Sequence, residues 1–332
     1  MHSLAFPLLI GLIALALAFD FLNGLHDAAN SIATVVSTQL LSPVAAVLFA
    51  AVGNFAAYWL VGLHVAETVG KGIIDKDVVT PAVVFGALIG AMFWNVVTWL
   101  KGIPSSSSHA LIGGLLGAGI MHGGFGAVES AGTSKTLLAI FLSPMLGFAI
   151  AMALVLLTTW IFHRWQPRRA EGVFKTLHLF SSAAYSISHG GNDAQKTMGI
   201  IAVLLYSTGH LRGDFHVPEW VVISCYLAIS LGTLSGGWRI IKTMGTKLTK
   251  LNHHTGFCAS TAGSIVVFGA SALGIPVSTT HAITGSVIGT GAALKPRSVR
   301  WSVAARVVFA WFVTIPASAA VGAAFYLLTR LF

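Results

Sequence analysis

Two short runs of hydroxyl side chains are the residues of this sequence best suited to binding chemistry. Residues 103–110 read IPSSSSHA, and residues 275–282, placed 172 positions later, read IPVSTTHA. The flanking residues keep the same register: Gly113, Gly117 and Pro144 correspond to Gly285, Gly289 and Pro316. Such an offset indicates an internal duplication.

An acidic motif precedes each hydroxyl run. Residues 24–31 read GLHDAANS, and residues 190–197 read GGNDAQKT, at an offset of 166. Positions i, i+3 and i+4 share one helical face. That face holds Asp27, Asn30 and Ser31 in the first copy and Asp193, Lys196 and Thr197 in the second. Two polar motifs per half, each set in apolar sequence, are typical of membrane carriers built by duplication.

The hydroxyl runs predict an anion site. A proline followed by serines or threonines favours a helix N-terminus, where free amide groups and the helix dipole attract negative charge. If the two helix starts meet in mid-membrane, their hydroxyls would surround a tetrahedral oxyanion. The candidate substrate residues are Ser105, Ser106, Ser107, Ser108, Ser278, Thr279 and Thr280, joined by Asn192. Plain helix capping is the structural alternative, and the symmetric second copy favours function.

The acidic motifs predict a cation site. A carboxylate at membrane depth costs about 2.5 kcal/mol or more unless a positive charge accompanies it. We therefore expect a coupling cation, a proton or sodium, at a site formed by Asp27, Asn30, Asp193 and Lys196. A purely structural ion pair of Lys196 with Asp27 or Asp193 is the alternative. Asp20 could equally serve helix packing or an access path.

Two histidines follow the hydroxyl runs at matching places. His109 and His281 could relay protons, since imidazole titrates near neutral pH. A neutral imidazole bonded to a backbone carbonyl explains them equally well. His26 and His189 are weaker candidates, and Asn192 occupies the place of His26 in the second copy.

The composition assigns the chain to the membrane. Only 9% of its 332 residues are charged and 55% are hydrophobic, whereas soluble globular domains carry about 25% charged residues. Apolar runs of about 20 residues, the length that crosses a bilayer, recur throughout. The clearest cover residues 43–64, 80–101, 136–162, 220–237, 257–275 and 302–328.

Charge bias predicts the topology. Twelve of the 19 basic residues lie in three clusters, within 164–175, 239–250 and 295–306, which the positive-inside rule places in the cytoplasm. The first half then makes three net crossings, so the second half starts on the opposite side and the repeats are inverted. We expect a first repeat at 1–163, a cytoplasmic basic linker at 164–175 and a second repeat at 176–332. Both termini are predicted outside.

The predicted fold is an all-α polytopic membrane protein in which each repeat has a broken polar helix and a re-entrant helical hairpin. The second hairpin arms, 109–122 and 281–294, are short for a membrane span and rich in glycine. Pro104 and Pro276 should end the preceding helix at each hinge.

Several function classes are excluded or weakened. The basic residues are not interleaved with aromatic residues on a soluble face, which argues against nucleic-acid binding. No metal-ligand cluster, nucleotide loop or cofactor motif occurs, and neither cysteine belongs to a CxxC pair. An intramembrane hydrolase would need one activated serine, but no serine is singled out. We expect a transporter and no enzyme.

The four motifs together resemble those of the PiT family of inorganic phosphate transporters, over nearly the whole chain. The resemblance implies that Asp27, Asn30, Asn192 and Asp193 bind the coupling cation and frame the substrate. It further implies that the two hydroxyl runs hold phosphate. The resemblance also implies an inverted-repeat bundle, usually a homodimer, that works by alternating access. The compact loops favour the inner membrane of a prokaryote.

Lys196 departs from the family's symmetric form, which has asparagine there. A tethered ammonium could replace one sodium ion, which favours coupling to protons or transport of a neutral metal–phosphate complex over sodium symport. Sulfate is the alternative substrate, because serine-rich helix ends suit any tetrahedral oxyanion.

Overall fold

The computed structural model describes residues 6–75, 78–211 and 214–331. These residues form a helical bundle, and one isolated β-bridge joins Ile74 to Val128. The first half contains α1 Phe6–Ser37, α2 Pro43–Leu60, α3 His64–Lys71, α4 Pro81–Lys101, α5 Ser107–Gly123 and α6 Ser130–Phe162. The second half contains α7 Pro167–Ser207, α8 Glu219–Ser235, α9 Trp238–Lys242, α10 His253–Ala272, α11 Thr279–Leu294 and α12 Trp301–Leu328, with a π-helical turn at Thr243–Lys247.

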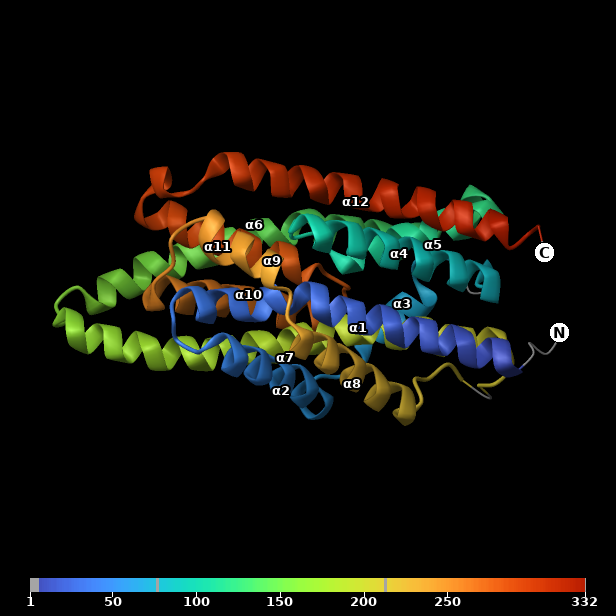
Figure 1. Cartoon of the computed structure of the whole chain (residues 1–332), viewed down its shortest axis with the longest axis horizontal. Helices are drawn as coiled ribbons and strands as arrows, with labels where there is room; N and C mark the ends of the chain where they lie inside the picture. The colour runs from blue at the N-terminus through green and yellow to red at the C-terminus, as the bar shows by residue number, and fades with distance from the viewer. Residues whose placement is uncertain (1–5, 76–77, 212–213, 332) are drawn as a thin grey trace.

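Most helices run along the long axis of the molecule (Figure 1). Six of the described helices, α1, α2, α4, α6, α10 and α12, are long and apolar enough to cross a membrane, and α8 joins them as a span bent by 63° towards α9. Both marked ends of the chain lie at one end of the bundle, and the turn between α6 and α7 lies at the other. Helices α1 and α7 therefore run in opposite directions, as inverted repeats require.

The hinged pairs α4–α5 and α10–α11 form the predicted hairpins. Gly102 and Gly274 end the first arms with φ of 62° and 66°, a left-handed conformation that glycine adopts without steric cost. An Ile-Pro pair follows, and Ser106 or Ser278 caps the second arm by accepting a hydrogen bond from the amide of the histidine three residues on, at 3.2 Å. Arms α5 and α11 have 17 and 16 residues.

Each second arm packs on a long helix of the other half. A Cβ added at Gly285 of α11 would lie 2.2 Å from the carbonyl oxygen of Pro144 in α6, and one at Gly117 of α5 would lie 2.1 Å from that of Ala319 in α12. The glycines that repeat in the sequence are thus the positions where hairpin backbone meets scaffold backbone.

The polar helices differ from expectation. We expected a broken polar helix in each repeat, but α1 and α7 continue through Asp27 and Asp193 without interruption. Helix α7 also begins at Pro167, because proline is favoured in a first helical turn. The segment 164–175 is therefore mostly helix, and only about four residues connect the halves.

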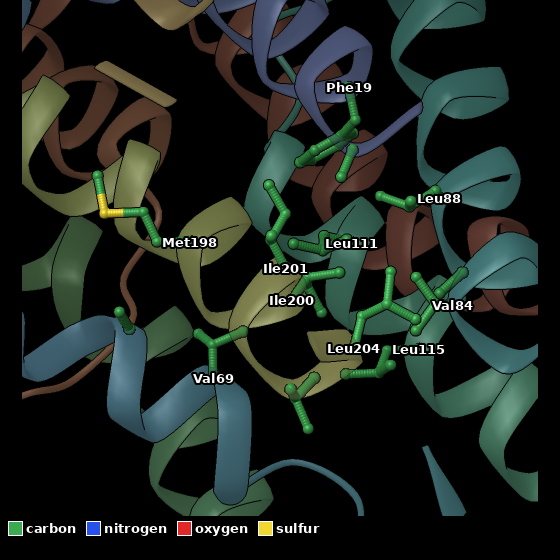
Figure 2. Close-up of a cluster of buried hydrophobic side chains, with 14 of the residues drawn as sticks. Phe19, Val69, Val84, Leu88, Leu111, Leu115, Met198, Ile200, Ile201 and Leu204 are labelled. Carbon is green, nitrogen blue, oxygen red and sulfur yellow. The ribbon is translucent and has the colours of Figure 1, made fainter. Parts of the chain in front are cut away.

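The apolar core interlocks the two halves. Figure 2 shows Met198, Ile200, Ile201 and Leu204 of α7 among side chains of the first half, which are Phe19, Val69, Val84, Leu88, Leu111 and Leu115. Conversely, Ile32 and Val35 of α1 belong to a second cluster with residues of α10 and α11. Each polar helix thus carries its motif at the boundary between two apolar clusters.

Candidate functional site

The two acidic motifs meet at the centre of the bundle. Three side-chain atoms lie within 4.8 Å of one another there: a carboxylate oxygen of Asp27 from α1, and a ring nitrogen of His189 and a carboxylate oxygen of Asp193 from α7. All three residues are buried. Two carboxylates this close repel each other unless positive charge lies between or beside them.

Both hairpin tips reach Asp27. Ser107 donates to its Oδ2 at 3.3 Å, and Thr280 donates to its Oδ1 at 3.4 Å. Asn30, one turn further along α1, donates to Thr280 at 2.9 Å. The starts of α5 and α11 therefore converge on one carboxylate from opposite directions.

Asp193 is neutralised by Lys196, its neighbour at i+3 on α7. The ammonium donates to the carboxylate and to Ser108, and it also donates to the carbonyl oxygen of Val277 at 2.8 Å. Thr279 donates to the other carboxylate oxygen at 3.0 Å. Lys196 thus forms the ion pair that we gave as the alternative to a cation site, and at the same time it joins the two hairpin tips.

His26 forms a short contact with Asp27, 2.7 Å between Nδ1 and Oδ1. The carboxylate can only accept, so Nδ1 of His26 is the donor in this contact. The hydroxyl of Thr98 lies 3.1 Å from Nε2 and 2.9 Å from the carbonyl oxygen of Trp94. These contacts fix the orientation of the imidazole ring beside Asp27.

His189 is oriented in a comparable way beside Asp193. Asn54 donates to Thr233 at 2.8 Å, so its carbonyl oxygen accepts from Nδ1 of His189 at 3.0 Å. The other ring nitrogen then faces Oδ2 of Asp193 at 3.3 Å. The sequence made both histidines weaker candidates, although His189 lies four positions before Asp193, a spacing that places two side chains on one helical face.

Other predicted site residues are engaged elsewhere. Ser105 exchanges a hydrogen bond with Thr314 of α12 at 2.8 Å, Ser106 and Ser278 cap their helices, and Asn192 donates to Ser271 of α10 at 2.8 Å. The hydroxyls that contact the charged centre are those of Ser107, Ser108, Thr279 and Thr280.

His109 and His281 lie against each other where the hairpin arms begin, with ring centroids 4.3 Å apart. Trp311 of α12 stacks on His281 at 3.7 Å. All four ring nitrogens lack a hydrogen-bond partner among the described residues.

Tyr185 is a site residue that the sequence did not indicate. Its hydroxyl donates to the carbonyl oxygen of Thr279 at 2.9 Å, and its side chain is fully buried. The residue fixes the start of α11 from the side of α7. Only its position two helical turns before Asp193 could have pointed to it.

Comparison with known proteins identifies the family to which this chain belongs. The model of a family described as "Phosphate transporter family" matches residues 23–168 and again residues 162–322. A probable low-affinity inorganic phosphate transporter of Rhizobium meliloti is 60% identical over 98% of this chain and 97% of its own length. A Bacillus subtilis protein of the same description is 41% identical, with 98% of each chain covered.

Among solved structures, one titled "The sodium-dependent phosphate transporter" superimposes with a TM-score of 0.91 at 27% identity, covering 98% of this chain and all of that one. Two family matches, high identity over nearly the whole length and a shared fold agree with the motifs. This chain belongs to the phosphate transporter family.

Proposed function

We propose that this protein imports inorganic phosphate together with a coupling cation, by alternating access. The observation that carries the proposal is the convergence of hydroxyls from both hairpin tips on two buried carboxylates. Hydroxyls and helix N-termini supply hydrogen-bond donors for an oxyanion. The two carboxylates repel that anion unless a cation binds with it.

Phosphate fits this centre better than sulfate does. Near neutral pH phosphate keeps at least one O–H group and can donate to a carboxylate, whereas sulfate is only an acceptor. The hydrogen bonds that reach Asp27 from the hairpin tips are long, at 3.3 and 3.4 Å. A phosphate hydroxyl would be a stronger donor to that carboxylate, while sulfate would be repelled.

A proton is the coupling ion that the centre supports best. The ammonium of Lys196 neutralises Asp193, and the ring of His26 lies against Asp27. A proton taken up by the His26–Asp27 pair would neutralise the second acidic centre, so charge balance would not require two sodium ions. Transport of a neutral metal–phosphate complex is the alternative consistent with the same charge balance.

Two cavities suit alternating access. One, of about 300 Å³, is lined by Ile103 and Pro104 of the first tip together with Lys101, Lys247 and Arg306. The other, of about 360 Å³, is lined by Ile275 and Pro276 of the second tip together with residues of α3 and α6. Each hairpin tip thus separates one cavity from the buried centre, and movement of either tip would open the centre to one side.

Orientation and location follow from the charge distribution. The α6–α7 turn, the segment between α9 and α10 and the start of α12, which carry the three basic clusters, lie at the end opposite the marked termini (Figure 1). We infer that this end is cytoplasmic, in a prokaryotic inner membrane. A homodimer is proposed on the family resemblance alone.

Uptake into proteoliposomes tests the proposal. Radiolabelled phosphate should accumulate under an imposed proton gradient, and radiolabelled sulfate should not. Asp27→Asn should reduce phosphate uptake to background, while Asp214→Asn, at an exposed acid outside the site, should leave it unchanged. His26→Asn, which copies the second repeat, should weaken the response to the proton gradient. Normal uptake by Asp27→Asn, or equal uptake of sulfate, would contradict the proposal.

A further inference from the structure

Three basic side chains line one cavity behind the bend of the first hairpin. The cavity has a volume of about 300 Å³, and Lys101, Lys247 and Arg306 are among the residues that line it. They come from three separate elements, which are the last turn of α4, the π-helical turn after α9, and α12. Helix packing therefore gathers three positive charges that lie far apart in the sequence.

The described protein does not neutralise these three charges. No ion pair of the described residues includes any of the three side chains. The three basic clusters of the sequence contain one acid, Glu171, and it lies 4.0 Å from Lys175. Like charges that share a cavity repel each other unless an opposite charge lies between them. The cavity therefore favours a negatively charged ligand.

The backbone of the bend is already bonded to the protein. Thr243 donates to the carbonyl oxygen of Gly102 at 2.9 Å, and the indole of Trp311 donates to the carbonyl oxygen of Pro104 at 3.1 Å. Both carbonyl oxygens thus have donors, so they do not compete with a ligand for the basic side chains. The groups left to bind a ligand are the ammonium and guanidinium donors.

The donors and the volume of the cavity suit a phosphate group. A guanidinium can bind two phosphate oxygens at once, and each ammonium adds a point charge. Pockets for small molecules have volumes of about 300–1,000 Å³, so this cavity suits a small ligand. No acidic residue is among the described residues that line it. Unlike the central site, the cavity should therefore accept sulfate as well as phosphate.

We propose that this cavity is a second anion site, in which Lys101, Lys247 and Arg306 bind a phosphate group. The source is either free inorganic phosphate or the headgroup of an anionic lipid, since both present the same oxygens. A bound anion would join the first hairpin arm, through Lys101, to α12, through Arg306. Any effect of this anion on import rests on the proposed function, whereas anion binding does not depend on transport.

A cysteine in the cavity wall reports its occupancy. Val303→Cys replaces a lining residue and keeps all three basic side chains, and both native cysteines are buried. We expect phosphate and sulfate each to slow the reaction of this purified full-length variant with a neutral maleimide, at an ionic strength held constant with potassium chloride. Gly172→Cys, at an exposed position outside the cavity, should react equally fast with and without either anion.

Removing the charges tests the assigned residues. Lys247→Gln, added to Val303→Cys, should raise the phosphate concentration that gives half of the protection by about tenfold, which is the contribution of one charge-assisted hydrogen bond. Adding Arg306→Gln as well should abolish the protection. Both side chains are exposed and without an ion pair, so their replacement should leave the midpoint of thermal unfolding unchanged.

A lipid arm separates the two sources. The Val303→Cys variant is reconstituted into phosphatidylcholine vesicles with or without phosphatidic acid, in the absence of free phosphate. Protection by both free anions identifies a soluble ligand, and protection by phosphatidic acid alone identifies a lipid headgroup. Either result supports the site if the protection is lost with the two charges.

Three results would overturn the inference. They are the absence of protection in every arm, protection that survives Lys247→Gln/Arg306→Gln, and protection by phosphate without protection by sulfate, which would arise from the central site. The proposed function fails in a different measurement, phosphate uptake into proteoliposomes, so the two failures are distinguishable.

Discussion

At the scale of residues, Lys196 sets the character of the site. It is buried, and its ammonium bonds to Asp193 on its own helix and to both hairpin tips. A bound metal ion could dissociate from that position, whereas the lysine remains attached to α7. In the proposed transport cycle, Lys196 therefore supplies the positive charge at Asp193 and the coupling cation binds at Asp27.

Removing one partner of this pair should destabilise the fold. Asp193→Asn leaves the Lys196 ammonium buried without its counter-charge, at an expected cost of about 3–5 kcal/mol. The double variant Asp193→Asn/Lys196→Met should recover most of that stability, yet it should not transport phosphate. Thermal unfolding in detergent, followed by tryptophan fluorescence, measures the difference. A single variant as stable as the wild type would show that the pair contributes no stability.

At the scale of elements, the hairpins are held by close backbone packing. Helix α5 lies on α12 and helix α11 lies on α6, with glycines at the contacts. No side chain intervenes at these positions, so the hairpin arms have little room to shift relative to the long helices. The proposed alternating access would therefore move the tips, where the chain bends at Gly102 and Gly274.

A methyl group at one of these glycines should disturb the packing. Gly285→Ala places Cβ 2.2 Å from the carbonyl oxygen of Pro144, and overpacking of this kind costs about 1–3 kcal/mol. Gly172→Ala provides the matched control, because nothing lies within 4 Å of its added Cβ and alanine favours helix. Thermal unfolding should separate the two variants, and equal midpoints would refute the close contact.

At the scale of the whole molecule, the charge distribution and the fold are consistent with one orientation of the bundle in the membrane. The basic connections gather at the end of the bundle opposite the marked termini (Figure 1). Each hairpin approaches the centre from a different side. The pseudo-symmetry that relates the two repeats therefore also relates the two approaches to the site.

Labelling with a membrane-impermeant maleimide checks this orientation. Both native cysteines are buried, which keeps the background low. Ser130→Cys at the start of α6 should react in intact cells, and Arg297→Cys, between α11 and α12, should react only after permeabilisation. The opposite pattern would invert the topology and with it the predicted outside position of the termini.

Much of this architecture could be predicted from the sequence because it depends on local or summed properties. Few charges in long apolar runs indicate a membrane protein, and the parity of crossings between basic clusters requires inverted repeats. Pro104, Pro276 and the hydroxyls after them predict helix starts, and α5 and α11 do begin there. The break expected in each polar helix is absent from α1 and α7. In α7 the motif glycines Gly190 and Gly191 pack closely against Asn54 and Val61 of the first half.

The sequence by itself determined the class of protein, the four motifs and their inverted arrangement, since composition, spacing and charge bias require no knowledge of distance. Only the tertiary structure decided which hydroxyls reach the acids, how Thr98 orients His26 and that basic side chains of three elements line one cavity. Those facts depend on contacts between residues as far as 253 positions apart. Such contacts arise from helix packing, which no local pattern records.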